Sequence, residues 1–206
     1  MAAARLSPWR PSVKRSRDHQ IKREAIVHAA ARAFRQRGYH NTSLDDIAAA
    51  LNVTKPTVYH YVGSKEALLF ECFRAGVDLI RAAFAEASEG GLDARTRLAA
   101  VVRRYVEAMT SEFGWCMVRA EDQDLGPALS REIKVVKSEI DQGLRRLLRE
   151  GIADGSIRDC DAKMTAFALA GALNWIAHWH RDSEALSPTQ IADRFLDIFD
   201  LGLRPR

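Results

Sequence analysis

The chain has 206 residues, of which 47% are hydrophobic, and its 31 basic and 27 acidic residues give a formal net charge of +4. This length suits one domain, or a small domain fused to a larger one, and no apolar run approaches the roughly 20 residues that cross a bilayer. The basic N-terminus lacks the apolar segment of a secretion signal, and the three cysteines form no CxxC pair. We therefore expect a cytoplasmic protein with reduced thiols and no membrane partner.

Charge is distributed unevenly along the chain. The first 65 residues hold 12 lysines and arginines against four acidic residues, a net charge of +8, whereas the remaining 141 carry 19 basic and 23 acidic residues, a net charge of −4. Such asymmetry indicates a polyanionic partner at the N-terminal end. A solvated basic surface without a partner is the alternative.

Apolar spacing predicts helix throughout and no strand, so we predict an all-α fold of nine or ten helices. The expected helices are 18–37, 43–51, 55–61, 64–88, 93–112, 129–151, 161–181 and 188–202, with a further short helix in the irregular stretch between 113 and 130. We predict that the chain is divided into three parts, namely a basic flexible tail (1–17), a small helix-turn-helix DNA-binding domain (18–64) and a larger effector-binding and dimerisation domain (65–206).

The short predicted helix 55–61 is the second helix of the helix-turn-helix, the one that enters the major groove of DNA. With Val58 facing inward, its remaining side chains cluster near the surface. Hydroxyl, imidazole and ammonium groups suit phosphate oxygens and base edges. The predicted DNA contacts are Lys55, Thr57, Tyr59, His60 and the flanking Lys65, together with the expected N-cap Thr54. For Tyr59 and Tyr61, packing against the first helix of the motif, 43–51, is the alternative.

The motif "TSLDDIAAALNVTKPTVYHYVGSKEALL", with "AAARAFRQRGYHNTSLDDIA" overlapping it upstream, resembles the signature of the TetR family of bacterial transcription regulators over about residues 20–70. The resemblance implies an all-α dimer with a separate C-terminal effector domain. It also implies DNA contacts at Thr42, Lys55, Thr57, Tyr59, His60 and Lys65. The closing stretch "GALNWIAHWHRDSEALSPTQIAD" resembles a TetR subgroup whose members respond to acyl-CoA thioesters.

A recognition helix of about seven residues reads only a few base pairs, so specific binding calls for two half-sites and a two-fold protein. Residues 161–181 are apolar all round, which lets one face meet the chain's own core and the other a second subunit. The predicted dimer interface comprises Phe167, Gly171, Trp175, Phe195 and Phe199. A helix wrapped wholly within the monomer is the alternative.

An apolar pocket is predicted in the larger domain. Aromatic and sulfur side chains of residues 105–115 are expected to face a polar i, i+4 pair on the helix 161–181, with an arginine at the pocket mouth. The predicted ligand-binding residues are Tyr105, Met109, Phe113, Trp115, Arg119, Asn174 and His178. Ordinary core packing, and pairing of Arg119 with a nearby acid, are the alternatives.

Metal and enzyme chemistry find no support in the motifs. His178 and His180 lie about 200° apart around a helix, and the chain has no HExxH, nucleophile elbow or phosphate-binding glycine loop. We predict no metal, no cofactor and no enzymatic activity.

The sequence predicts a homodimeric one-component transcriptional regulator, a repressor, that binds a palindromic operator on double-stranded DNA. A small-molecule effector, either an acyl-CoA or another apolar metabolite, would release it. The alternative is a helical small-molecule-binding or interaction protein with a nonspecific basic tail.

Overall fold

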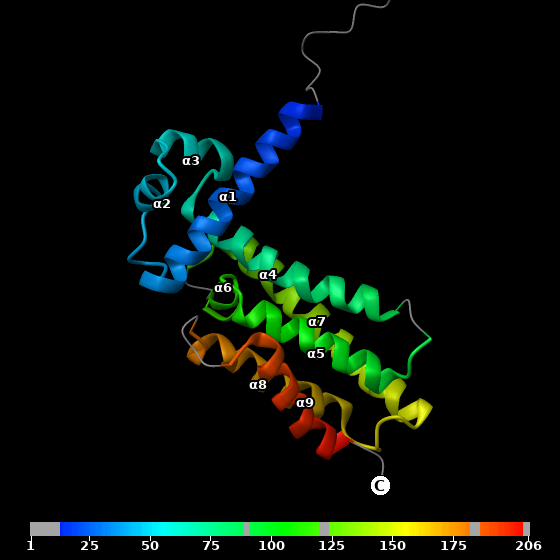
Figure 1. Cartoon of the computed structure of the whole chain (residues 1–206). Helices are drawn as coiled ribbons and strands as arrows, with labels where there is room; N and C mark the ends of the chain where they lie inside the picture. The colour runs from blue at the N-terminus through cyan, green and yellow to red at the C-terminus, as the bar shows by residue number, and fades with distance from the viewer. Residues whose placement is uncertain (1–12, 89–90, 120–123, 182–185, 204–206) are drawn as a thin grey trace, which may run out of the picture.

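The computed structural model of the chain describes residues 13–88, 91–119, 124–181 and 186–203, with side chains from Arg17 onward. Within these residues the chain forms nine α-helices and no strand, which confirms the predicted all-α fold. The helices are α1 (Val13–Arg37), α2 (Leu44–Ala50), α3 (Lys55–Val62), α4 (Lys65–Ser88), α5 (Ala94–Thr110), α6 (Gly114–Arg119), α7 (Pro127–Asp154), α8 (Ala162–Trp179) and α9 (Pro188–Leu203). Figure 1 shows α1–α3 as a small group above the larger group α4–α9.

The three N-terminal helices share one small core. Phe34 of α1, Ile47 of α2 and Val58 of α3 are at most 1% exposed, and each such side chain stabilises the fold by about 1.5–3 kcal/mol. α2 opens with a capping box. The Asp46 N–H donates to Ser43 Oγ (3.1 Å), and the Ser43 N–H donates to the Asp46 carboxylate (2.7 Å). This pairing fixes where α2 begins and hence how α3 is presented.

α1 is longer than predicted. It begins at Val13 rather than at residue 18, so residues 13–17 of the predicted tail are helical, and no glycine or proline interrupts the chain from there to Arg37. The helix ends because Gly38 takes a φ of +82°, a left-handed conformation that glycine adopts without steric cost. The rest of the predicted tail, residues 1–12, lies outside the described residues.

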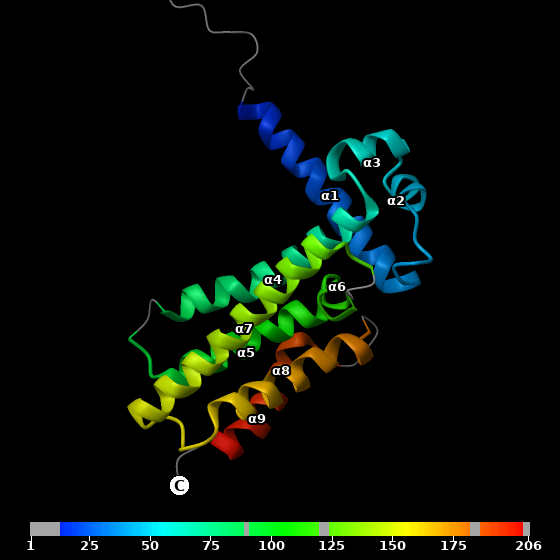
Figure 2. The same cartoon turned by 180° about the vertical axis from the view of Figure 1, so that it is seen from behind.

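α5 lies at the centre of the larger group. It packs against α4, α6, α7, α8 and α9, and its buried side includes Val101 and Val106, both 0% exposed. α4 also contacts α1 and α3, and the short helix α6 contacts α1, α4, α5 and α8. Figure 2 shows α6 at the end of the larger group that lies next to α1. α4 and α6 therefore connect the two groups of helices.

α7 continues beyond its predicted end. The sequence favoured a stop at Gly151, but that residue is buried within the helix, and a Cβ there would lie 2.5 Å from Ile157 Cδ1. The glycine thus permits close packing, and the helix ends instead at Gly155, which takes a left-handed φ of +78°. None of the described helices is long and apolar enough to cross a membrane.

Candidate nucleic-acid interface and ligand cavities

A tight turn joins α2 to α3. Asn52 takes a φ of +52°, a left-handed conformation that asparagine adopts more readily than most residues. The following Val53 N–H donates to the Ala48 carbonyl (3.0 Å). Thr54 is then the N-cap of α3, and Pro56 lies in the first turn. Two short helices joined by such a turn form the predicted helix-turn-helix.

α3 has one buried and one exposed face. Val58 and Val62 are 0% and 8% exposed, whereas Tyr59 is 45% exposed. Lys55 and His60 are exposed as well. The outer face therefore presents a phenol, an ammonium and an imidazole, which are donors for phosphate oxygens and base edges. In Figure 1, α3 lies in the upper part of the molecule, beside α1 and away from α5–α9.

Three of the predicted contacts have partners within the helix-turn-helix. The Lys55 ammonium donates to the Asp45 carboxylate of α2 (2.6 Å). This hydrogen bond, together with the negative charge of Asp45, raises the pKa of Lys55. The hydroxyls of Thr54 and Thr57 are hydrogen-bonded to each other (2.9 Å). The start of α3 is thus a polar surface whose side chains are ordered by hydrogen bonds, and Lys55 carries its positive charge.

Thr42 does not lie at this surface. Its side chain is 1% exposed, and its hydroxyl donates to the Gly38 carbonyl (2.8 Å). The prediction that Thr42 contacts DNA is therefore wrong for its side chain, which closes the turn after α1. Lys65 is half-buried at the start of α4, with its ammonium 4.2 Å from the centre of the Tyr39 ring, and burial lowers the pKa of Lys65.

The structure places Tyr61 against α1, whereas the alternative that the sequence left open was packing against the first helix of the motif, 43–51. Tyr61 is half-buried, and its ring centre lies 4.6 Å from that of His19 in α1. The His60 ring lies 5.2 Å from the Tyr61 ring, nearly perpendicular to it. Tyr61 therefore holds α3 against α1, and Tyr59 is the tyrosine on the open face.

A mainly apolar cavity of about 420 Å³ is lined by residues of α4, α5, α6, α7 and α8. This volume falls within the range of about 300–1,000 Å³ that is usual for small-molecule sites. We call it the effector cavity, after the role that the sequence predicts for this part of the chain. The residues on its walls include Phe73, Val77, Met117, Ile140, Phe167 and Trp175.

Polar or charged side chains interrupt the apolar wall, namely Tyr105, Lys137, Asp141, Asn174 and His178. The Tyr105 hydroxyl donates to Asn174 Oδ1 (2.9 Å), and both residues line the effector cavity. Burial raises the pKa of Tyr105 to about 12, so that the phenol stays protonated at neutral pH. A few convergent polar groups in an apolar wall are what orients a bound small molecule.

A second cavity, of about 710 Å³, lies where α1 meets α6 and α8. We call it the junction cavity. Trp115 and Arg119, both predicted ligand-binding residues, line this cavity, whereas His178 lines both cavities. Arg119 Nη2 donates to His178 Nδ1 (3.2 Å). Burial, followed by the charge of Arg119, lowers the pKa of His178.

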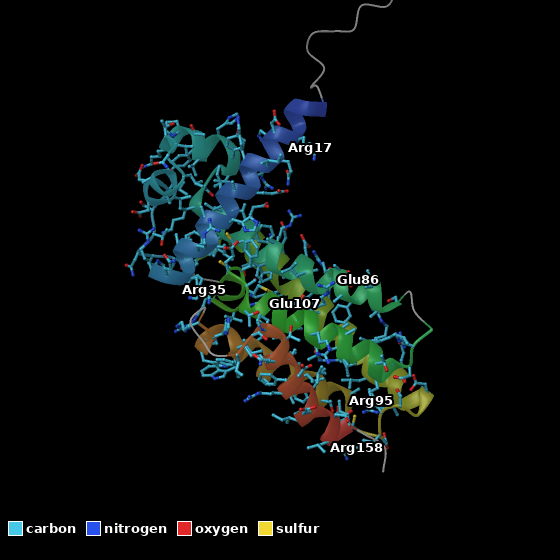
Figure 3. The ribbon with its side chains drawn as sticks, in the orientation of Figure 1. Arg17, Arg35, Glu86, Arg95, Glu107 and Arg158 are labelled. Atoms are coloured by element: carbon cyan, nitrogen blue, oxygen red, sulfur yellow. The ribbon has the colours of Figure 1, made fainter. Side chains whose placement is uncertain are left out.

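Sequence reasoning missed three arginines on the wall of the junction cavity, namely Arg32, Arg35 and Arg181. Figure 3 shows Arg35 near the lower end of α1, where the larger group begins. The spacing of Arg32 and Arg35 places them on one face of α1, a signal that was present in the sequence. Met109 and Phe113, which were predicted to line the pocket, are 2% and 8% exposed and line neither cavity. They are core residues, the alternative that the sequence left open.

α8 is apolar on both faces, as predicted. Leu173 and Ile176 are 0% exposed on its buried face, while Phe167 and Trp175 are 49% and 62% exposed on the other. On α9 the most exposed apolar side chain is Leu201, at 85%. We call the exposed set the α8–α9 surface, consisting of Met164, Phe167, Gly171, Trp175, Ile198 and Leu201.

The two predicted interface residues of α9 are less exposed than those of α8. Phe195 and Phe199 are half-buried, with stacked rings whose centres are 6.1 Å apart. Phe199 lines a shallow cavity together with Val102 of α5. Both phenylalanines pack against the core, whereas Ile198 and Leu201 of the same helix are exposed.

Two family models match the chain. The model described as bacterial regulatory proteins of the tetR family matches residues 26–72, and the model described as the tetracyclin repressor-like C-terminal domain matches residues 91–203. The transcriptional repressor KstR2 of Rhodococcus jostii is 29% identical over 188 residues, which cover 88% of this chain and 91% of that protein.

Two solved structures have a similar fold. PfmR, a TetR family regulator of Thermus thermophilus, is 27% identical with a TM-score of 0.77, over 84% of this chain and 95% of that one. AibR, solved in complex with isovaleryl coenzyme A and operator DNA, is 28% identical with a TM-score of 0.75, over 86% of this chain and 97% of that one.

Proposed function

Because the chain belongs to the TetR family of transcription regulators, we propose that it is a cytoplasmic one-component repressor. In this proposal it binds a palindromic operator as a homodimer, and a small-molecule effector releases it. The helix-turn-helix domain ends near residue 64, and the effector-binding and dimerisation domain begins with α4. The observation that carries the proposal is the open polar face of α3.

DNA binding is assigned to the start and the outer face of α3. Thr54, Lys55, Thr57, Tyr59 and His60 supply hydroxyl, ammonium and imidazole groups within two turns of helix. Such a helix enters the major groove, where Tyr59 and His60 reach base edges and Lys55 reaches a phosphate. We keep Lys65 as a flanking phosphate contact, which requires its ammonium to leave the Tyr39 ring.

Self-association is assigned to the α8–α9 surface. Its large apolar side chains include Trp175 and Leu201, which are 62% and 85% exposed in the single chain. Contiguous exposed apolar surface is typical of a protein–protein interface. A two-fold dimer through this surface would present two α3 helices to two half-sites of an operator.

The effector is assigned to the effector cavity. Its apolar walls suit an acyl chain or a similar hydrocarbon group, and the Tyr105–Asn174 pair supplies a place for a carbonyl. AibR, whose structure resembles this chain, was solved with an acyl-CoA. We therefore propose an acyl-CoA thioester, or another apolar metabolite of similar size, as the effector.

A capture of genomic fragments with the purified protein tests the DNA assignment. The enriched fragments should share a palindromic site, and Tyr59→Ala should weaken binding to that site by about tenfold or more. Leu79→Ala is a matched control, because Leu79 is 44% exposed on α4 against 45% for Tyr59. If about six phosphates are neutralised per dimer, the logarithm of the binding constant should fall with the logarithm of salt concentration with a slope of about −5. Enrichment of no common site, or equal binding by both variants, would contradict the proposal.

A further inference from the structure

The junction cavity carries an excess of positive charge. Among the described residues that line it, four are arginines and one is a glutamate, Glu112. His178 adds no full charge near neutral pH, because its pKa is lowered. Like charges held in one concave site repel each other, and their combined field attracts anions into it.

Within the part of the chain that the structure describes, two of these arginines have only uncharged hydrogen-bond partners. Arg119 Nη2 donates to the ring nitrogen of His178 (3.2 Å), and Arg181 Nη1 donates to the carbonyls of His178 (3.2 Å) and His180 (3.0 Å). A guanidinium carries five N–H donors. Both side chains therefore keep donors and a full charge for a ligand, and both are exposed to it.

The arginines come from both groups of helices. Arg32 and Arg35 lie on α1, next to the helix-turn-helix, whereas Arg119 ends α6 and Arg181 follows α8. Figure 3 shows Arg35 at this boundary between the two groups. Trp115 adds an aromatic side chain to the same wall. A ligand that engages arginines from both sides would tie α1 to α8.

We propose that the junction cavity binds a small polyanion, the phosphate or pyrophosphate group of a phosphorylated metabolite. Planar guanidinium groups bind phosphate oxygens through two parallel N–H bonds, and more strongly than they bind neutral acceptors. The volume of about 710 Å³ is that of a small-molecule site and far exceeds a single chloride ion. Of the described residues, His178 lines both this cavity and the effector cavity, and the other lining residues of the two cavities differ.

Glu112 gives the site a way to act on α1. Its carboxylate accepts a hydrogen bond from Arg32 Nη1 (3.0 Å) and also binds the ring of His28, so that it links the connection between α5 and α6 to α1. A phosphate in the cavity competes with Glu112 for Arg32. Anion binding would therefore exchange an internal link between the domains for a link through the ligand. This effect on DNA rests on the proposed function, but the anion site itself does not.

Calorimetric titration of the full chain without DNA tests the site, with inorganic pyrophosphate as the probe. The double variant Arg119→Gln/Arg181→Gln should bind pyrophosphate about tenfold or more weakly than the original chain, because it removes charge and donors from the wall. The matched control is Arg131→Gln/Arg149→Gln, which removes the same charge from exposed positions of α7. The control should stay within about twofold, since exposed charges at a distance are screened by salt.

Thermal melting with and without pyrophosphate gives a second readout, because a ligand of the folded state raises the melting temperature. The double variant should melt near the original temperature without pyrophosphate and lose most of the shift with it. No heat and no melting shift in the original chain would overturn the proposal, as would equal losses in the control variant. A parallel titration with inorganic phosphate shows which of the two anions the cavity prefers. We expect pyrophosphate to bind more tightly than phosphate. If pyrophosphate binds but the genomic capture yields no common site, the proposed function fails while the anion site stands.

Discussion

The Lys55 side chain is held at the start of α3 by a carboxylate from the preceding helix. Asp45 lies 2.6 Å from the ammonium, and both side chains are about half exposed. The same ammonium is a proposed phosphate contact, so Asp45 and DNA compete for it. The ion pair keeps Lys55 charged and orders it, but it also lowers the local positive charge that attracts a polyanion.

We expect Asp45→Asn to tighten binding to double-stranded DNA severalfold at low salt, because Lys55 loses its competitor and the interface gains one unit of positive charge. Fluorescence anisotropy over a salt series measures this change. The control is Asp78→Asn, which makes the same change in net charge on α4. An equal gain in both variants would show that only net charge matters and that the ion pair does not restrain Lys55.

The predictability of α3 differs from residue to residue. The inward position of Val58 follows from helical spacing and was predicted correctly. Thr42 was assigned to the DNA by resemblance alone, and the structure buries it, because its hydroxyl satisfies the carbonyls of Ala33 and Gly38 near the end of α1. A polar residue in a loop can serve the backbone or a partner, and the sequence does not distinguish these roles.

Among the secondary-structure elements, helix ends depend on capping and packing that the sequence signals only in part. Asp161 is the N-cap of α8, and its carboxylate accepts hydrogen bonds from the N–H groups of Lys163 (2.8 Å) and Met164 (3.0 Å). These bonds, first that from Met164 and then that from Lys163, lower the pKa of Asp161. A carboxylate at a helix N-terminus is also favoured by the helix dipole.

The lowered pKa of Asp161 predicts a loss of stability in acid. Its folded-state pKa lies below the ordinary value of about 3.9, so its contribution is complete above that value and disappears as the pH falls through the folded-state pKa. Asp161→Asn keeps a capping side chain but removes the titration. Urea denaturation between about pH 5 and about pH 2 should show a smaller loss of unfolding free energy for this variant.

The comparison variant is Asp197→Asn, which lies within α9 and caps no helix. This variant should lose as much unfolding free energy in acid as the original chain does. If the two variants lose stability in parallel with the original chain, the cap of α8 makes no pH-dependent contribution.

Helical spacing predicted every helix but not every end. The missed end of α7 shows the reason, because Gly151 looks like a stop signal until the close approach of Ile157 is known. The extension of α1 to Val13 has a similar origin, since a basic stretch without breakers reads equally well as tail or helix. Local patterns define elements, whereas contacts between distant residues decide where they end.

For the whole molecule, the α8–α9 surface predicts self-association. We expect Trp175→Asp/Leu201→Asp to be monomeric at concentrations where the original chain is a dimer, because two charges would be buried in an apolar interface. Size-exclusion chromatography with light scattering gives the mass. Val135→Asp is the control, since Val135 is 59% exposed on α7, outside this surface. A dimeric double variant, or an original chain that is monomeric throughout, would refute the assignment of the interface.

The cavities were the least predictable features of the molecule. Arg32, Arg119 and Arg181 are far apart in the sequence, and the packing of α6 against both α1 and α8 brings them to one wall. The predicted ligand set was divided between two cavities and the core for the same reason. The sequence shows which residue types lie along one helix, but it does not show where three helices meet.

Phe167, Gly171 and Trp175 belong both to the wall of the effector cavity and to the α8–α9 surface. If the proposed effector fills this cavity and the proposed dimer forms through this surface, effector binding and dimerisation share these residues, and any coupling between the two equilibria acts equally in both directions. With such coupling, diluting the protein would change how much metabolite half-saturates it, so a cell that makes more of this chain would also reset the threshold at which the chain responds.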